Sequence, residues 1–572
     1  MTSRPFISIR PLRSFFLVVL TILLSFQFAQ AQSLFNFWGR SPVFQTEQGP
    51  VQGKMDGDVV VLKGIPYAKP PIGSRRLRAP EEPNPRPAGE VFSATQESSV
   101  SLQMLPGLNK VFGSEDSLYL NMWIPKNTTH EPLPVMVWIH GGAFILGGGY
   151  HKVLRTSIYD AKALAEAGKV IIVSFNYRLG ALGFMAHEDL QKEDPNHSTG
   201  NYGILDMIMA LRWVNKNIAN FGGDPKNITI FGESAGGISV LTLLASDLAK
   251  GLFSRAIVQS GLLMDSTLAQ AKKVGNKIMM DLRKFGIRSI ADLRAMSAED
   301  FTRATQMGDI KPGDEVRNQY NPVVDGYTLK RPILEQIQSG EYNQVPTLIG
   351  TNADEMAVLG PAFFKALKDD MTDAEYQSLI VELLRVTPGQ AKAIAAQYSS
   401  KTYGNNKKAL EALGNNATFH YPAQELVKAF EQYQPQTNYR YVWTQKMKFL
   451  GAGHGLELLY LFPNALQDYL RHLMTYDPRK TLLQHWNMIR QREFSDLMIR
   501  YWTRFAKTGN PNGGKDPLWP TGGNRQIMEL NANHSGAFAE GYESQKMDKL
   551  EEILVPGFSG SLGMTCSSVH MQ

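Results

Sequence analysis

The sequence is poor in cysteine and carries no strong excess of one charge. Its single cysteine, Cys566, excludes a disulfide within the chain, so the fold must depend on packing and hydrogen bonding. The net charge is +6, and half of it comes from three arginines in residues 1–31, which contain no acidic residue. This excess gives no reason to expect nucleic acid or an anionic membrane as a partner. The oligomeric state is not indicated.

Long hydrophobic runs are also lacking, apart from one near the N-terminus. That stretch, residues 15–28, is shorter than the roughly 20 apolar residues that a spanning helix needs. It follows three arginines (Arg4, Arg10, Arg13) and precedes the small-x-small tripeptide Ala29-Gln30-Ala31. The pattern predicts a signal peptide over residues 1–31 and a secreted or periplasmic protein without a stable membrane anchor. The alternative is an uncleaved anchor, which the short stretch disfavours.

Short β-rich runs alternate with amphipathic helical stretches along the rest of the chain. The runs cover 135–139, 170–175, 228–231, 256–258 and 347–349, and residues 204–219 show the helical period. This alternation predicts an α/β fold with a central, mostly parallel, twisted sheet flanked by helices. No Pro/Gly/Ser-rich linker divides the chain, which favours one domain over residues 32–572. Within it, residues 265–431 are predicted to form helical excursions that build a lid or pocket wall, and residues 557–572 a flexible tail.

One segment combines a β-rich run, Gly232-Glu233-Ser234-Ala235-Gly236 and a helical pattern over residues 238–244. A G-x-S-x-G motif places its serine on a sharp strand-to-helix turn, where the following helix directs its N–H groups toward a developing oxyanion. The bare motif is weak, because glycine and serine are common in turns. The strand before it and the helix after it make Ser234 the candidate nucleophile.

A serine nucleophile needs a base and an acid, which in this arrangement follow in the order acid, then histidine. Six histidines lie beyond Ser234: His420, His454, His472, His485, His534 and His570. His454 is favoured, because the glycine-rich loop Gly451-Ala-Gly-His-Gly455 can present its ring into a cleft. For the acid, Glu355 follows the run 347–349, but the pattern does not separate it from its neighbour Asp354. His140-Gly-Gly-Ala-Phe144 follows another run and is a candidate oxyanion donor loop, or an ordinary glycine turn.

These segments together resemble the type-B carboxylesterase and cholinesterase family along most of the chain after residue 31. The motifs stand in family order: Gly64-Ile-Pro-Tyr-Ala68, Ser114-Glu-Asp-Ser-Leu-Tyr-Leu-Asn121, Asn176-Tyr-Arg-Leu-Gly180, Phe221-Gly-Gly-Asp-Pro225, the Ser234 motif, His454-Gly-Leu-Glu457 and Phe505-Ala-Lys-Thr-Gly-Asn-Pro511. The resemblance implies the α/β-hydrolase fold with large helical insertions that form a gorge. Serines at both positions of the family's first disulfide, Ser101 and Ser117, favour a bacterial-type member.

The resemblance assigns roles that the residues alone leave open. It implies a catalytic triad of Ser234, Glu355 and His454, and backbone oxyanion donors at Gly142, Ala143 and Ala235. It further implies that Glu233 and Ser260 support these groups, although Glu233 could be only a polar turn residue and Ser260 only a strand end. No metal or organic cofactor is expected.

The sequence also departs from the family pattern. Ser101 and Ser117 stand where the family has its first disulfide, so the loop between them must be held by packing. That loop contains no tryptophan, which argues against choline esters. Ala143 replaces a frequent glycine, a change linked in the family with esters of bulky alcohols. Met356 replaces another frequent glycine, after the acid.

The resulting prediction is a serine carboxylesterase that hydrolyses small to medium carboxylic esters through an acyl-enzyme. Its expected partner is a small-molecule ester. A lipase or an amidase would use the same triad, and the motifs do not separate these activities. A non-catalytic binding protein on the same fold is a further alternative, which the presence of all three triad residues disfavours.

Overall fold

A central sheet organises the fold in this computed structural model. The description covers residues 41–105, 110–126, 131–150, 152–153, 156–306, 320–363, 368–384, 386–435, 437–448, 450–464, 481–521, 526–533, 535–538 and 542–554. The predicted signal peptide, the predicted tail and Cys566 lie outside these residues.

Within the described residues the central sheet has 11 strands, in the order β20-β19-β18-β17-β14-β13-β9-β12-β8-β4-β3. In chain order the strands are β3 (Lys54–Asp56), β4 (Val59–Pro66), β8 (Tyr119–Pro125), β9 (Leu133–Ile139), β12 (Ile171–Phe175), β13 (Gly223–Glu233), β14 (Arg255–Gln259), β17 (Thr347–Asn352), β18 (Asn438–Trp443), β19 (Ile527–Leu530) and β20 (Gly536–Phe538). Neighbours from β12 to β19 pair in parallel, and the pairs at both edges are antiparallel. The predicted mostly parallel sheet is confirmed.

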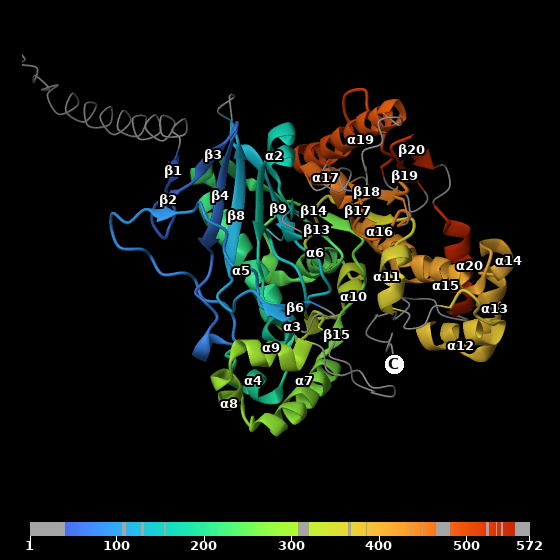
Figure 1. The fold of residues 1–572 in the computed structure, drawn as a ribbon, viewed down its shortest axis with the longest axis horizontal. Helices are drawn as coiled ribbons and strands as arrows, with labels where there is room; N and C mark the ends of the chain where they lie inside the picture. The colour runs from blue at the N-terminus through green and yellow to red at the C-terminus, as the bar shows by residue number, and fades with distance from the viewer. Residues whose placement is uncertain are drawn as a thin grey trace, which may run out of the picture.

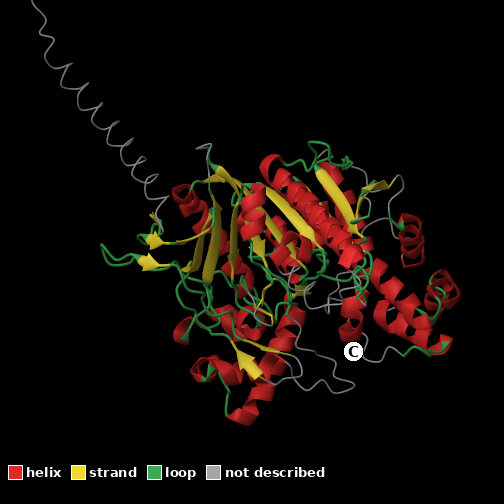
Figure 2. Cartoon of the chain, turned by 45° about the horizontal axis from the view of Figure 1, so that its top comes forward, coloured by secondary structure: helices red, strands yellow, loops and turns green. Residues whose placement is uncertain are grey.

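The central strands are buried on both faces, which explains why they read as continuous apolar runs. Along β9, Val135 and Val137 pack into one hydrophobic cluster, whereas Met136 and Trp138 pack into another. Side chains of α5 (Tyr202–Asn217) and α6 (Ala235–Ala245) belong to the first cluster. Those of α2 (Lys162–Gly168) and α19 (Thr481–Thr508) belong to the second. The sheet therefore lies between two helical layers (Figure 2).

Residues 265–431 are mostly helical, and β17 is the strand that this region contributes to the central sheet within the described residues. The helices are α7 (Leu268–Leu282), α8 (Ile290–Ala295), α9 (Ala298–Gln306), α10 (Ile333–Gln338), α11 (Met356–Phe363), α12 (Asp373–Leu384), α13 (Pro388–Gln397), α14 (Ser400–Tyr403), α15 (Asn406–Asn415) and α16 (Tyr421–Tyr433). In Figure 1, α7–α9 lie on one side of the molecule, and α12–α15 lie on another beside α20 (Ser544–Leu554). Their predicted role as a lid or pocket wall stays a prediction.

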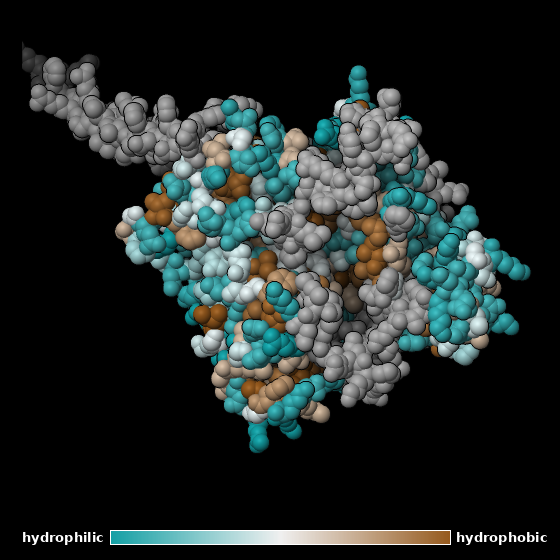
Figure 3. All heavy atoms as spheres, in the orientation of Figure 1, coloured by the Kyte–Doolittle hydropathy of each residue, from teal (hydrophilic) through white to brown (hydrophobic). Residues whose placement is uncertain are grey.

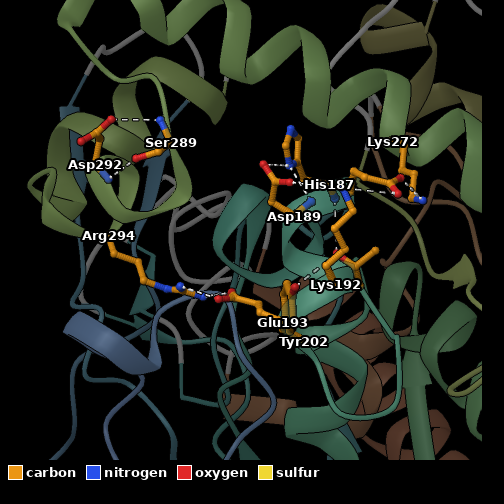
Figure 4. A network of polar contacts seen from close by, with 11 residues as sticks. His187, Asp189, Lys192, Glu193, Tyr202, Lys272, Ser289, Asp292 and Arg294 are labelled. Carbon is orange, nitrogen blue, oxygen red and sulfur yellow. Dashed lines mark hydrogen bonds and ion pairs between the residues drawn. The ribbon is translucent and has the colours of Figure 1, made fainter.

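Ion pairs join α7 and α8 to α4 (Glu188–Glu193). Arg294 donates from its guanidinium to the carboxylate of Glu193, and Lys272 Nζ lies 2.7 Å from Glu188 Oε2 (Figure 4). Ion pairs at a surface contribute little individually, so these contacts are expected to add little to the stability of the fold.

Ser101 and Ser117 are both buried and joined by a hydrogen bond of 2.9 Å between their hydroxyl oxygens. Ser101 Oγ also donates to the carbonyl oxygen of Tyr177 at 2.7 Å. Because a hydroxyl has one proton, Ser117 must be the donor in the Ser–Ser bond. This polar contact stands where the resemblance places a disulfide.

Among the residues that are coloured by hydropathy in Figure 3, polar residues predominate, and hydrophobic residues gather in smaller groups between them. No helix in the described part of the chain is both long and apolar enough to cross a membrane.

Candidate active site

Ser234 lies on the turn between β13, which ends at Glu233, and α6, which begins at Ala235. Its backbone has φ 57° and ψ −123°, a conformation that only strong surrounding packing maintains in a residue other than glycine. The turn is so tight that a Cβ at Gly236 would lie 2.0 Å from the carbonyl oxygen of Ile139. Glycine is therefore required there, and the Ser234 side chain remains partly exposed.

The glycine-rich loop after β9 lies against this turn. A Cβ on Gly141 would be only 3.0 Å from Ser234 Cβ. Gly142 and Ala143 adopt positive φ angles of 108° and 54°, which turn the backbone away from the strand direction. Ala235 is the first residue of α6, so its N–H has no partner within the helix. Of the three predicted oxyanion donors, Ala235 thus follows Ser234 directly in the chain, and Gly142 and Ala143 belong to the loop whose Gly141 lies against Ser234.

Glu355 and His454 meet although they are 99 positions apart. His454 Nδ1 lies 2.6 Å from Glu355 Oε2, and the Glu355 side chain is fully buried. The other oxygen, Oε1, accepts hydrogen bonds of 2.7 Å from Ser260 Oγ and 2.7 Å from the Asn352 N–H. These contacts hold a carboxylate in one orientation against the ring, and Ser260 contacts the acid as the resemblance implies.

Alternative candidates for the acid and for the base have other hydrogen-bond partners or lie outside the described residues. Asp354 Oδ2 accepts from the N–H of Ala452 at 2.9 Å, so this carboxylate binds the backbone of the histidine loop. His420 is buried and its Nδ1 lies 2.7 Å from Thr351 Oγ1. Burial, with Arg440 nearby, lowers the pKa of His420 to about 3, so this ring is neutral. His472, His534 and His570 lie outside the described residues.

Glu233 lies on the other side of the histidine ring, with Oε1 3.1 Å from His454 Nε2. The angles at these two atoms are unsuitable for a hydrogen bond. In the described structure neither Glu233 Oε1 nor His454 Nε2 has another hydrogen-bond partner. The structure therefore places His454 Nε2 beside Glu233, and no hydrogen bond yet joins it to Ser234. Catalytic contacts of this kind commonly tighten only when substrate is bound.

Three buried carboxyl groups surround His454, and they cannot all ionise freely. Burial raises the pKa of Glu233 to about 8, and the nearby carboxylates of Glu457 and Glu355 add to this. Burial also raises the pKa of Glu457. Burial alone would lower the pKa of the His454 imidazole, but Glu233 and Glu355 offset it and raise that pKa to about 9. The buried carboxyl groups therefore oppose one another's ionisation, whereas their negative charge favours the protonated form of the imidazole between them.

The described residues contain no group of three or more His, Cys, Asp or Glu side chains arranged to hold a metal ion. The chemistry available at this site is that of a serine hydroxyl, an imidazole, a buried carboxylate and backbone N–H groups.

The model of the carboxylesterase family matches residues 40–550. The chain belongs to the carboxylesterase family. It is accordingly a carboxylic ester hydrolase, and the family resemblance of its motifs is confirmed.

Relatives and solved structures agree with this membership. The carboxylesterase is 34% identical to the para-nitrobenzyl esterase of Bacillus subtilis (strain 168) over 479 residues, which cover 82% of this chain and 90% of that protein. It is 33% identical to the fumonisin B1 esterase of Sphingopyxis macrogoltabida over 488 residues, 84% of each chain. Its fold matches the crystal structure of a Geobacillus stearothermophilus carboxylesterase with a TM-score of 0.74 at 32% identity, covering 88% of this chain and 99% of that one.

In this carboxylesterase a buried hydrogen-bond network beside Glu355 and His454 was not predicted from the sequence. Trp502 Nε1 donates to Gln259 Oε1 at 3.0 Å, and Gln259 Nε2 donates to Glu457 Oε1 at 3.1 Å. Asn352 Nδ2 donates to Glu457 Oε2 at 2.6 Å. Glu457 stands in the His454 motif, but nothing in the sequence identifies its partners in β14 and β17, or the residue of α19 that bonds Gln259.

Two further residues of the carboxylesterase lie beside His454 and Glu355. The ring of Phe419 lies 5.4 Å from that of His454, and it belongs to a π-helical turn, Asn416–His420, of a kind frequent at functional sites. Met356, which replaces a family glycine, is buried against Gly414, where a Cβ would lie 3.0 Å from Met356 Cγ. The missing side chain at Gly414 makes room for the methionine.

Proposed function

We propose that this carboxylesterase hydrolyses small to medium carboxylic esters through a Ser234–His454–Glu355 triad and an acyl-enzyme intermediate. The observation that carries the proposal is the 2.6 Å contact between His454 Nδ1 and Glu355 Oε2 beside a strained serine turn. A buried carboxylate hydrogen-bonded to Nδ1 leaves Nε2 as the atom that exchanges a proton with the nucleophile.

In this mechanism Ser234 Oγ attacks the ester carbonyl while His454 Nε2 accepts its proton. Glu355 fixes the imidazole tautomer and stabilises the imidazolium that forms. The N–H groups of Gly142, Ala143 and Ala235 donate to the tetrahedral oxyanion, and the loss of one such donor typically raises the barrier by about 3 to 4 kcal/mol. His454 then protonates the leaving alcohol, and water hydrolyses the acyl-enzyme by the same route.

The proposal of an ester substrate is supported by the names of two relatives, a para-nitrobenzyl esterase and a fumonisin B1 esterase. The signal pattern of residues 1–31 supports an exported enzyme.

The test is hydrolysis of p-nitrophenyl esters of increasing acyl length by the wild type and by Ser234→Ala. We expect turnover by the wild type, loss of that turnover in the variant, and stoichiometric labelling of the wild type alone by an organophosphate. The chain-length profile would size the acyl pocket, and a sharp rise above the solubility limit of the substrate would indicate a lipase. Undiminished turnover by folded Ser234→Ala would refute the triad. A folded wild type that hydrolyses no ester would instead favour a binding protein.

A further inference from the structure

The two loops that carry the acid and the histidine are joined by one side chain, that of Asn352. Asn352 is the last residue of β17, and its side chain is fully buried. Its backbone N–H donates to Glu355 Oε1 at 2.7 Å. Its side-chain amide donates to the carbonyl oxygen of Gly453 at 2.8 Å and to Glu457 Oε2 at 2.6 Å.

These acceptors bracket the histidine in sequence. Gly453 immediately precedes His454, and Glu457 follows it by three positions. One amide nitrogen therefore holds both ends of the segment that presents the ring, while the backbone N–H of the same residue holds the acid. Among side chains of this size only an amide supplies two donors from one atom, because aspartate offers none, leucine none, and serine or threonine one.

The oxygen of the same amide indicates that this arrangement has a cost. Asn352 Oδ1 is buried and makes no hydrogen bond within the described structure. A buried acceptor without a partner reduces stability, and such groups call for an explanation beyond packing. The orientation of the amide is fixed by its neighbours, since both contacted atoms are oxygens that accept.

We propose that Asn352 is a positioning residue, which fixes the His454 segment relative to Glu355 so that the two side chains meet in the catalytic geometry. This inference rests on the proposed triad and adds to it a residue that touches neither substrate nor the reacting atoms. A displacement of about 1 Å at a catalytic group can lower the rate about 100-fold.

The test compares Asn352→Leu and Asn352→Asp with a matched control, Asn438→Leu. Asn438 is buried at the start of the adjacent strand β18, donates to the carbonyl oxygen of Gln434 at 2.6 Å, and also leaves Oδ1 without a partner. Asn438 is therefore a second buried asparagine with a donating amide and an unpartnered oxygen. It lies at the opposite end of the strands from Asn352, away from the proposed triad. The measurements are kcat and KM for p-nitrophenyl acetate across pH, the melting temperature, and the low-field proton resonance of the His454–Glu355 hydrogen bond.

We expect both Asn352 variants to lower kcat about 100-fold with KM changed less than about threefold. We also expect the low-field resonance to shift or disappear. In Asn352→Leu the acid limb of the kcat profile should move to lower pH, because a weaker bond to Glu355 and a less anionic Glu457 both reduce the stabilisation of the imidazolium. Asn438→Leu should change the melting temperature without these effects.

If Asn352→Leu changes the melting temperature as Asn438→Leu does, with kcat and the low-field resonance unaltered, Asn352 is a structural residue and the inference is wrong. Should Asn352→Leu fail to fold, Asn352→Ser retains one donor and is expected to give an intermediate loss of kcat; wild-type kcat in it would overturn the inference. Ser234→Ala separates a failure of the proposed triad from a failure of the role of Asn352. Retained turnover in Ser234→Ala would refute the triad itself, whatever the Asn352 variants do.

Discussion

Glu233 Oε1 lies 3.1 Å from Nε2 of His454, the nitrogen that takes the proton of Ser234 in the proposed mechanism. Glu233 is the residue immediately before the nucleophile, so the chain brings a second carboxyl group to the ring from the side opposite Glu355. An anion at this position favours the imidazolium and opposes its return to the neutral base. The charge on Glu233 therefore sets the pH range in which His454 can act.

Glu233→Gln should move the acid limb of the kcat/KM profile to lower pH. The sign follows from the base being active only when unprotonated. Carboxylates raise the pKa of His454 to about 9 in the wild type, and a neutral glutamine of equal size removes one of them. A charge at this distance typically shifts a pKa by about 1 unit or more. The measurement is kcat/KM for p-nitrophenyl acetate from acid to alkaline pH, and an unmoved or raised midpoint would contradict the account.

Ser260→Ala should lower kcat about tenfold with little change in KM, because hydrogen bonds to a charged group contribute about 1.5 to 3 kcal/mol. Ser260 Oγ donates to Glu355 Oε1 at 2.7 Å, and alanine leaves that oxygen with the Asn352 N–H alone. The matched control is Ser246→Ala, which removes a buried hydroxyl that donates to the Thr328 carbonyl at 2.6 Å, away from the triad. Equal kcat values for the two variants would show that Ser260 has no part in orienting Glu355.

The double substitution Ser101→Cys with Ser117→Cys should form a disulfide and stabilise the protein. The two hydroxyl oxygens lie 2.9 Å apart across a sequence separation of 16, and closing a loop of that length contributes up to about 3 kcal/mol. Unfolding in urea, with and without a reductant, measures the gain. Each single cysteine variant should be less stable than the wild type, because it breaks the buried hydroxyl pair. A double variant whose stability does not respond to reductant would contradict this prediction.

The sequence predicted those features of the fold that are encoded within one short segment of the chain. The strand, the G-x-S-x-G turn and the helix around Ser234 all lie within residues 223–245, so their pattern can be read from one segment. The alternation of apolar runs and helical stretches likewise predicted the parallel sheet, because each run and each helical stretch can be recognised within its own short segment.

Long-range pairings could not be predicted in this way. Asp354 and Glu355 are adjacent in the sequence, and their contacts depend on the histidine loop, about 100 residues later. In the fold Glu355 contacts the His454 ring, whereas Asp354 accepts from the backbone N–H of Ala452. Trp502 and Gln259 are 243 positions apart, and neither residue type identifies the other as its partner. Their contact arises from the packing of α19 on the sheet.

Gly236→Ala should greatly reduce activity, although the substitution adds one methyl group to a good helix position. The new Cβ would lie 2.0 Å from the carbonyl oxygen of Ile139, so α6 or the strand before the donor loop must move. Either movement displaces Ser234 or the donors Gly142 and Ala143, and we expect kcat to fall at least about 100-fold. Gly222→Ala is the control: it has φ 81° and open space around it, so it should cost only about 1 kcal/mol of backbone strain and leave kcat unchanged. Similar kcat values for the two variants would mean that the turn can relax, and that close packing at Gly236 does not hold the nucleophile in place.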